Sequence, residues 1–273
     1  MPHLLTYNIH YWEGVDGATD LERTIEVIRA SGADIVGLNE VYHPAKLKGW
    51  DRPALEIMAE RLGMGFVFGQ AQTFPLAFNR PGRSFGNALL SRWPILASAA
   101  HHLNPSNGHA PRGLLEARIL LPDGNRTLTV YVTHLDAESE EVRLAQTQAL
   151  LSWTIRDRAR PHVLMGDFNA YNPADYPDAA SLDELRRTVE GLGLSLYEPK
   201  VINRVLRAGY VDAWTQVGEG AAPTCCNQPD PLFRIDYVFV SESLAPDLRS
   251  CRRWQSAPAA IASDHLPVLV ELT

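Results

Sequence analysis

Short apolar runs, several of them alternating with polar residues, recur along the chain and predict a protein rich in β-strands. The predicted strands are Leu4–Ile9, Asp34–Leu38, Asn87–Ser91, Leu114–Leu121, Leu128–Thr133, His162–Gly166, Ile235–Val240 and Pro267–Leu272. The turn-forming string Pro122–Asn125 separates two of these runs and predicts a tight hairpin. Because a tight hairpin joins antiparallel strands, at least part of the β-structure is expected to be antiparallel.

Apolar residues at helical spacing lie between some of the strands. The predicted helices run from the capping box Thr19–Glu22 to a stop at Gly32, from Pro53 to Gly63, and from Ser139 to about Ala159. Helices and strands do not alternate strictly, which argues against a purely parallel sheet. The pattern therefore favours mostly antiparallel sheets packed together under flanking helices.

No repeat, low-complexity segment or Gly/Pro/Ser-rich linker divides the sequence, so residues 1–273 are expected to form a single domain. Three segments are richer in turn-forming residues and are predicted to be surface loops: 101–111, 171–181 and 218–231. Loops of this kind on a large domain often carry function.

Composition and charge narrow the class of protein. The chain has 273 residues, 45% of them hydrophobic, and a formal net charge of −7, which excludes a disordered or coiled-coil protein. No apolar run approaches the ~20 residues of a membrane span, and the start of the chain lacks the pattern of a signal peptide. Three cysteines are too few for a disulfide framework. We therefore expect a cytoplasmic monomer without stable membrane association, and the acidic charge disfavours unspecific coating of nucleic acid.

Polar side chains cluster where the predicted strands begin or end. They are Asn8, Asn39, Glu40, His134, Asp136, Asp167, Asn169, Asp236, Asp264 and His265. Any one of them can be explained as a turn former or a structural histidine, but so many strand ends of this kind suggest one shared rim. Carboxylate and amide oxygens suit Mg²⁺ or Mn²⁺ together with a phosphate-bearing substrate. Zinc-ligand spacing, a glycine-rich phosphate loop and a serine nucleophile motif are all absent from the sequence.

The strings that carry a family resemblance are Asn8–His10 with Asp16–Gly17, Leu38–Val41, Gly86–Ser91, Thr133–Asp136, Gly166–Asn169, Ile235–Tyr237 and Ser263–His265. In this order they resemble the endonuclease/exonuclease/phosphatase superfamily. That superfamily includes DNase I, abasic-site endonucleases, neutral sphingomyelinases and inositol polyphosphate 5-phosphatases. The resemblance spans residues 4 to 272 and implies a DNase I-like fold: a four-layer α/β sandwich with two mainly antiparallel sheets between helices.

The resemblance also implies a role for each matching residue. Glu40 is the implied principal Mg²⁺ (or Mn²⁺) ligand, with Asn8 and Asp264 beside it. The implied catalytic residues are His134, Asp167, Asn169, Asp236 and His265. Asp167 and Asn169 would position the attacking water, and Asp236 would orient His265. Either Asp167 or the His265–Asp236 pair can be the general base.

Further residues are predicted to contact the substrate or to support the site. Asn87, Arg112 and His10 are the predicted substrate or phosphate contacts. Arg143 and Gln146 resemble an Arg-x-x-Gln signature of bacterial family members. Asn39 departs from the family pattern, which usually has Gln before the Glu, so the amide there is one methylene shorter.

The predicted function is metal-dependent hydrolysis of phosphodiester bonds, of the DNase I-like nuclease or phosphodiesterase type, with DNA or RNA as the partner. The alternatives are a phospholipid head-group phosphodiesterase and an inositol-phosphate or small-molecule phosphatase. A non-enzymatic binding module is disfavoured because every matched position is intact. Phe74–Phe78 is the candidate lipid-binding loop, and Arg80–Arg83 and Arg204–Arg207 are the candidate basic contacts to a duplex.

Overall fold

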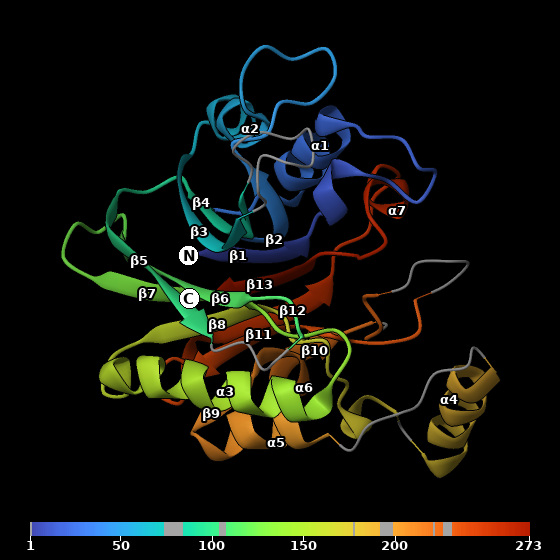
Figure 1. Ribbon diagram of the computed structural model, residues 1–273. Coiled ribbons are helices and arrows are strands. Elements are labelled where there is room, and N and C mark those ends of the chain that lie inside the picture. The colour runs from blue at the N-terminus through green and yellow to red at the C-terminus, as the bar shows by residue number, and fades with distance from the viewer. Residues whose placement is uncertain are drawn as a thin grey trace.

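The computed structural model describes residues 2–73, 84–103, 108–176, 178–191, 199–220, 222–225 and 231–273. Its strands form two sheets that lie face to face between layers of helices (Figure 1). The first sheet has the order β10 (Gly218–Glu219), β12 (Leu248–Arg253), β13 (Val268–Leu272), β1 (His3–Asn8), β2 (Ile35–His43), β4 (Ser84–Ser91) and β3 (Gly65–Thr73). The second has the order β5 (Ile95–Leu103), β6 (Arg112–Leu120), β7 (Thr127–His134), β8 (His162–Asp167), β11 (Asp236–Ser241) and β9 (Tyr210–Asp212).

Most neighbouring strands in both sheets run antiparallel. Among the described strands, the parallel pairs are β1–β2, β7–β8 and β10–β12. The predicted hairpin is confirmed, because β6 and β7 pair antiparallel on either side of Pro122–Asn125. The expected four-layer α/β sandwich with two mainly antiparallel sheets is therefore confirmed.

Helices cover the outer face of each sheet (Figure 1). The first sheet is covered by α1 (Leu21–Ser31), α2 (Ala54–Leu62) and α7 (Ala259–Ala262), and the second by α3 (Glu140–Thr154) and α5 (Lys200–Arg207). The helix α6 (Ala213–Val217) packs on β12, and α4 (Ala179–Gly191) lies to one side. A separate apolar core fills the space between the sheets, and Ile35, Val132 and Met165 contribute to it with 0% exposure.

The helix boundaries follow from local chemistry. Gly32 and Gly63 end α1 and α2 in the left-handed conformation, as predicted. The start of α1 corrects the prediction, because Asp20 rather than Thr19 is the N-cap and accepts hydrogen bonds from two backbone N–H groups of the first turn. Ser139 caps α3 as predicted, but the α-helix ends at Thr154 rather than near Ala159.

Several elements escaped the sequence pattern. The missed strands are β3, β5, β9, β10 and β12, and the missed helices are α4, α5, α6 and α7. The strand β5 is an edge strand whose residues 96–100 are all exposed, so it shows no alternation of buried and exposed positions. It extends into the predicted loop 101–111, and α4 begins inside the predicted loop 171–181.

Parts of other predicted features lie outside the described residues. These parts are Phe74–Phe78, Arg80–Arg83, residues 104–107 and 177, and residues 221 and 226–230 of the loop 218–231. Among the described residues, no helix is both long and apolar enough to cross a membrane.

Candidate active site

The strand register brings the predicted residues to one end of the two sheets. Asn8 at the end of β1 pairs with Asn39 on β2, and His134 at the end of β7 pairs with Asp167 at the end of β8. Asp236, at the start of β11, is the antiparallel partner of the same Asp167. The expectation of one shared rim is therefore met by these strand ends, although they are up to 228 positions apart in a chain of 273 residues.

Gly166 permits the close approach of β7 and β8 just before Asp167. Its φ is +137°, and a Cβ atom built on it would lie 1.9 Å from the carbonyl oxygen of Thr133. Any side chain at this position would push the two strands apart. The glycine of the Gly166–Asn169 string is thus required by the backbone that carries His134 and Asp167.

Asn39 joins the two sheets beneath the site. Its fully buried Nδ2 donates to the backbone oxygen of Thr133 at 2.8 Å and to Oδ1 of Asn87 at 2.9 Å. Its Oδ1 accepts a hydrogen bond from the backbone N–H of Asp167 at 2.9 Å. The shorter amide that departs from the family pattern therefore links β2 directly to the backbones of β7 and β8.

Asn87 supports Asn39 and does not face the predicted substrate space. Its Nδ2 donates to the backbone oxygens of Gly113 and Val132 at 2.9 and 3.3 Å, and its side chain is buried. All three polar groups of the amide are thus occupied by protein atoms. This corrects the predicted substrate contact, because the side chain of Asn87 has no hydrogen-bonding capacity to offer a phosphate.

Asn8 connects the two carboxylates at the centre of the site. Its Nδ2 donates to Oε1 of Glu40 at 3.2 Å and to Oδ2 of Asp167 at 3.0 Å. Oδ1 of Asp167 accepts a hydrogen bond from the backbone N–H of Asn169 at 2.8 Å. Burial, and then the nearby charge of Asp236, raise the pKa of Asp167 to about 7. Asp167 can therefore accept a proton near neutral pH.

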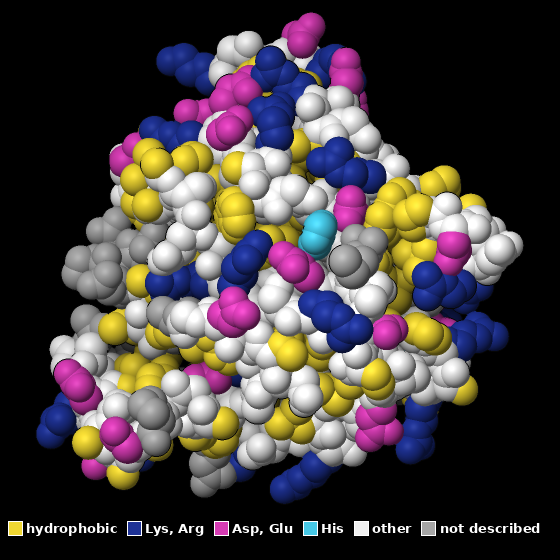
Figure 2. Space-filling model, turned by 180° about the vertical axis from the view of Figure 1, so that it is seen from behind, with side chains coloured by type: hydrophobic (Ala, Val, Ile, Leu, Met, Phe, Trp, Pro, Cys, Tyr) yellow, Lys and Arg dark blue, Asp and Glu magenta, His cyan; other side chains and the backbone are white. Residues whose placement is uncertain are grey.

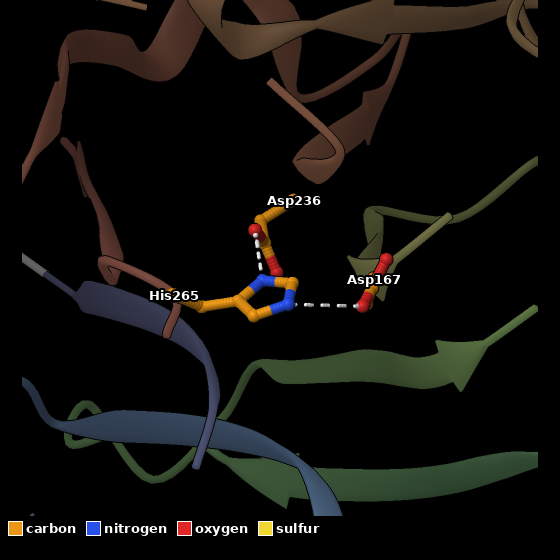
Figure 3. Close-up of side chains that lie close together, drawn as sticks. All are labelled: Asp167, Asp236 and His265. Atoms are coloured by element: carbon orange, nitrogen blue, oxygen red, sulfur yellow. Dashed lines mark hydrogen bonds and ion pairs between the residues drawn. The ribbon is translucent and has the colours of Figure 1, made fainter. Parts of the chain in front are cut away.

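His265 lies between two acids, as Figure 3 shows. Its Nδ1 is 2.8 Å from Oδ2 of Asp236, and its Nε2 is 3.7 Å from Oδ2 of Asp167. The hydroxyl of Thr224 donates to the same Asp236 oxygen at 2.6 Å. Burial opposes the charged ring, but the charge of Asp236 and its hydrogen bond outweigh burial and raise the pKa of His265 well above its usual value. The ring is therefore a cation that Asp236 orients.

His134 has the opposite charge state. Its Nε2 lies 3.6 Å from Oδ2 of Asp167 and 4.0 Å from Oε1 of Glu40. Burial, together with the positive charges of Arg112 and His265, lowers the pKa of His134 well below its usual value. Nη1 of the buried Arg112 lies 3.0 Å from Nδ1 of His134, so this predicted phosphate contact is adjacent to the catalytic candidates.

The remaining predicted residues lie at the rim of this cluster. The side chains of His10 and Asp264 are 33% and 41% exposed, and Nδ1 of His10 is 3.9 Å from Oδ1 of Asp264. Asn169 is half-buried, and its Nδ2 donates to the backbone oxygen of Leu135 at 3.0 Å. Asp264 is thus placed beside His10 and not within the buried group that contains Asp167.

Strained backbone is concentrated at the same place. In the described part of the chain, the non-glycine residues with positive φ are His10, Tyr11, Trp12, Glu40 and Asn169. A side chain in this conformation is disfavoured and persists only where surrounding contacts enforce it, which is common at functional sites. The register shift in β2 between Leu38 and Val41 turns the Glu40 side chain toward Asn8.

The donor set fits a hard divalent cation. Asp167, Asp236 and His265 offer ligand atoms that all lie within 4.8 Å of one another. Glu40 adds a second carboxylate beside them, and Nδ2 of Asn8 donates to both Glu40 and Asp167. Oδ1 of the buried Asp236 has no hydrogen-bond partner in the described part of the chain. Such oxygen-rich groups are typical of Mg²⁺ or Mn²⁺ sites.

Sequence reasoning missed some supporting residues and explained others incompletely. Thr224 and Tyr11 belong to no motif of the sequence. Folding brings Thr224 to Asp236 and Tyr11 to Glu40. The Arg143–Gln146 signature now has a structural reason. Nη1 of Arg143 donates to the backbone oxygen of Asp136, and the backbone N–H of Asp136 donates to Oε1 of Gln146. The pair therefore fixes the segment that follows His134.

The model of the Endonuclease/Exonuclease/phosphatase family matches residues 5–265. Comparison with curated proteins gives no match. Among solved structures, an endonuclease/exonuclease/phosphatase from Beutenbergia cavernae has 26% identity and a TM-score of 0.76, and the match covers 99% of this chain and 71% of that one.

Two more distant structures share the fold. A mannosyl-6-phosphatase from Bacteroides thetaiotaomicron has a TM-score of 0.72 at 18% identity, with 100% of each chain covered. An AP endonuclease from Archaeoglobus fulgidus has a TM-score of 0.67 at 18% identity, with 100% of this chain and 99% of that one covered. Their names describe two kinds of phosphoester, so the fold alone does not select the substrate.

Proposed function

Because this chain belongs to the endonuclease/exonuclease/phosphatase family, we propose that it is a divalent-metal-dependent hydrolase of phosphodiester bonds of the nuclease or phosphodiesterase type. The observation that carries the proposal is the group around Asp167. A charged His265, a neutral His134 and the amide of Asn8 all surround this one carboxylate. Hydrolysis of a phosphoester needs a proton acceptor for the attacking water, hydrogen-bond donors for the phosphoryl oxygens and a proton donor for the leaving oxygen.

Each residue of the group has a distinct task in the proposed reaction. Glu40, Asn8 and Asp167 are the proposed metal-side groups, because Nδ1 of His265 is already engaged by Asp236 at 2.8 Å and its Nε2 is proposed to donate a proton. A bound Mg²⁺ or Mn²⁺ supplies charge neutralisation of the phosphoryl oxygens. Asp167 accepts a proton from the attacking water, and His265 donates through Nε2 toward the phosphoryl or leaving oxygen.

Arg112 and His134 are the proposed phosphate-binding pair. Arg112 has a buried Nε without a hydrogen-bond partner in the described part of the chain, and its Nη1 lies next to His134. An oxyanion placed there would satisfy the guanidinium, because arginine donors match phosphate oxygens well. His10 and Asp264, at the rim, are proposed to contact more distant parts of the substrate or its waters.

The net charge of −7 favours a substrate held by few backbone contacts. On the face seen in Figure 2, basic and acidic side chains are interspersed and form no continuous basic band. Arg204 and Arg207 line a groove of about 570 Å³ between α3 and α5, on the outer helical layer and not at the site. The predicted duplex contact through Arg204–Arg207 therefore has no support, and we propose DNA or RNA as a weakly held substrate.

The cellular setting is also part of the proposal. Cys251 is free and buried, which suits a reducing compartment such as the cytoplasm. We propose a monomer acting without stable membrane association.

The test is an activity profile of purified protein in EDTA, Mg²⁺ and Mn²⁺. The substrates are DNA, RNA, sphingomyelin, an inositol phosphate and bis(4-nitrophenyl) phosphate. EDTA should abolish hydrolysis and Mg²⁺ or Mn²⁺ should restore it, with diesters cleaved ahead of monoesters. Full activity in EDTA would refute metal dependence. Turnover of sphingomyelin alone, or of monoesters alone, would replace the nuclease proposal with one of the alternatives.

The ligand role of Glu40 needs its own measurement. Glu40→Ala should weaken Mg²⁺ binding in calorimetry, whereas Glu141→Ala, an exposed residue in the first turn of α3, should bind Mg²⁺ as the parent protein does. Equal Mg²⁺ affinity in all three proteins would contradict the assignment.

A further inference from the structure

An aromatic group lies directly beside the candidate active site. Tyr11 comes from the His10–Trp12 turn, Tyr42 from β2 and Phe85 from β4. The rings of Tyr11 and Tyr42 are stacked with centroids 4.8 Å apart, and Phe85 lies 6.0 and 5.9 Å from them. These three residues are called the aromatic shelf below, and no sequence motif assigns them a role.

The aromatic shelf is continuous with both halves of the site. On the phosphate side, the Phe85 ring lies 6.2 Å from the ring of His134 and 5.8 Å from the guanidinium carbon of Arg112. On the metal side, Tyr11 belongs to the His10–Trp12 turn, which is joined to Asn8 by the hydrogen bond from the backbone N–H of His10 to Oδ1 of Asn8 at 3.1 Å. A phosphoester held by these residues would therefore carry its neighbouring group toward the shelf.

The backbone under Tyr11 is costly to form. The φ angles of His10, Tyr11 and Trp12 are 41°, 56° and 64°, so three consecutive side chains adopt a left-handed turn. Trp12 anchors the turn in the core with 1% exposure, and Oδ1 of Asn8 accepts a hydrogen bond from the backbone N–H of His10 at 3.1 Å. An ordinary turn would need a glycine here, so the strain indicates that the placement of these side chains matters.

The accessible part of the shelf has the character of a stacking surface. Phe85 is buried at 7% exposure, whereas Tyr11 and Tyr42 are half-buried. Aromatic faces next to a phosphate-binding arginine are the combination that proteins use to hold single nucleotides and unpaired bases. An alkyl chain could bury apolar area on these rings but could not stack on them as a flat ring does.

We propose that the aromatic shelf binds a flat ring, of the nucleobase type, that the substrate carries next to its phosphoester, and that Tyr11 is the principal contact. This inference rests on the proposed function, because the phosphoester must first be held at Arg112 and His134. Stacking on an aromatic side chain favours binding by on the order of 10- to 100-fold per base. The shelf therefore sets specificity for the group beside the phosphate, while the residues around Asp167 carry out hydrolysis.

The test compares two diesters with the same leaving group: the 4-nitrophenyl ester of thymidine 5′-monophosphate and methyl 4-nitrophenyl phosphate. In each, water attacks phosphorus and 4-nitrophenolate leaves. The parent protein should prefer the thymidine ester in kcat/KM by roughly tenfold or more. Tyr11→Leu should bring this ratio close to one, and Tyr11→Phe should keep it. Damage to metal binding would lower both rates together and leave the ratio unchanged.

Trp153→Leu is the matched control. Trp153 is 38% exposed, stacks on His101 with centroids 4.0 Å apart, and lies near the end of α3 that is farther from His134. This variant should retain the ratio of the parent protein. If Tyr11→Leu does not fold, the parent protein still supplies an answer. Thymidine 5′-monophosphate should inhibit hydrolysis of the methyl ester at a concentration about tenfold lower than methyl phosphate does.

The outcomes separate this inference from the proposed function. Hydrolysis of both esters with a ratio near one, or an unchanged ratio in Tyr11→Leu, would overturn the role of the shelf and leave the diesterase proposal standing. No hydrolysis of either ester with Mg²⁺ or Mn²⁺ would overturn the proposed function itself.

Discussion

Replacing Asp167 by Asn should stabilise the metal-free protein above neutral pH, although Asp167 belongs to the candidate active site. Burial and the charge of Asp236 raise the pKa of Asp167 from 3.8 to about 7 in the folded protein. At a pH between these two pKa values, Asp167 is protonated in the native state and ionised in the unfolded chain. The free energy of unfolding therefore falls as the pH rises through this window.

The size of the effect follows from the shift in pKa. At about 1.4 kcal/mol per pKa unit, a carboxylate shifted from 3.8 to about 7 costs the folded protein about 4 kcal/mol once the pH exceeds 7. Asn does not ionise and avoids this cost. It loses the hydrogen bond from Asn8 to Oδ2, which costs about 1–3 kcal/mol at every pH. The parent protein should thus be more stable near pH 4 and the variant more stable near pH 8.

The assay is urea unfolding followed by tryptophan fluorescence in EDTA, from about pH 4 to about pH 8. The difference in unfolding free energy between Asp167→Asn and the parent protein should change sign across this range. Asp51→Asn, the same substitution at an exposed loop position, should follow the parent protein at each pH. Parallel plots of unfolding free energy against pH for Asp167→Asn and the parent protein would refute the reasoning. They would mean that the pKa of the Asp167 carboxyl is not raised in the folded protein.

Two further predictions concern groups that act together. His265→Ala and Asp236→Asn should each lower kcat by about 100-fold or more, the range typical of positioned proton transfer. The double variant should be hardly slower than the slower single variant, and strictly additive losses would show that Asp236 does not orient His265. Asn39→Ala should lower the free energy of unfolding by about 3 kcal/mol or more, because its buried partners on three strands lose their hydrogen bonds. Asn203→Ala, at an exposed position on α5, is the control, and an equal urea midpoint in both variants would count against the bridging role of Asn39.

The sequence predicts well those elements whose structure follows from their own residues. The central strands such as β1, β7 and β8 are continuous apolar runs, and Gly32 and Gly63 end helices by their own backbone freedom. The edge strand β5 was missed because its exposure depends on what lies beside it in the sheet, which no local pattern contains. The N-cap of α1 differed by one residue because Thr19 and Asp20 are both good caps.

The chemical identity of the candidate site was present in the sequence, because the polar residues at strand ends are local features. Their common location was not, since it depends on the pairing of Asn8 with Asn39 and of Asp167 with both His134 and Asp236. Strand register is decided by contacts between distant segments that bury one face of each sheet.

Charge states and supporting contacts belong wholly to the tertiary structure. Burial favours the neutral form of both histidines, and Arg112 lowers the pKa of His134 further. At His265 the charge and hydrogen bond of Asp236 outweigh burial and raise the pKa. The aromatic shelf likewise exists only where the left-handed turn brings Tyr11 onto Tyr42. The sequence by itself determined which chemical groups are available at the strand ends. The packing of the two sheets decided which groups meet, because desolvation and charge act only between atoms that folding brings together.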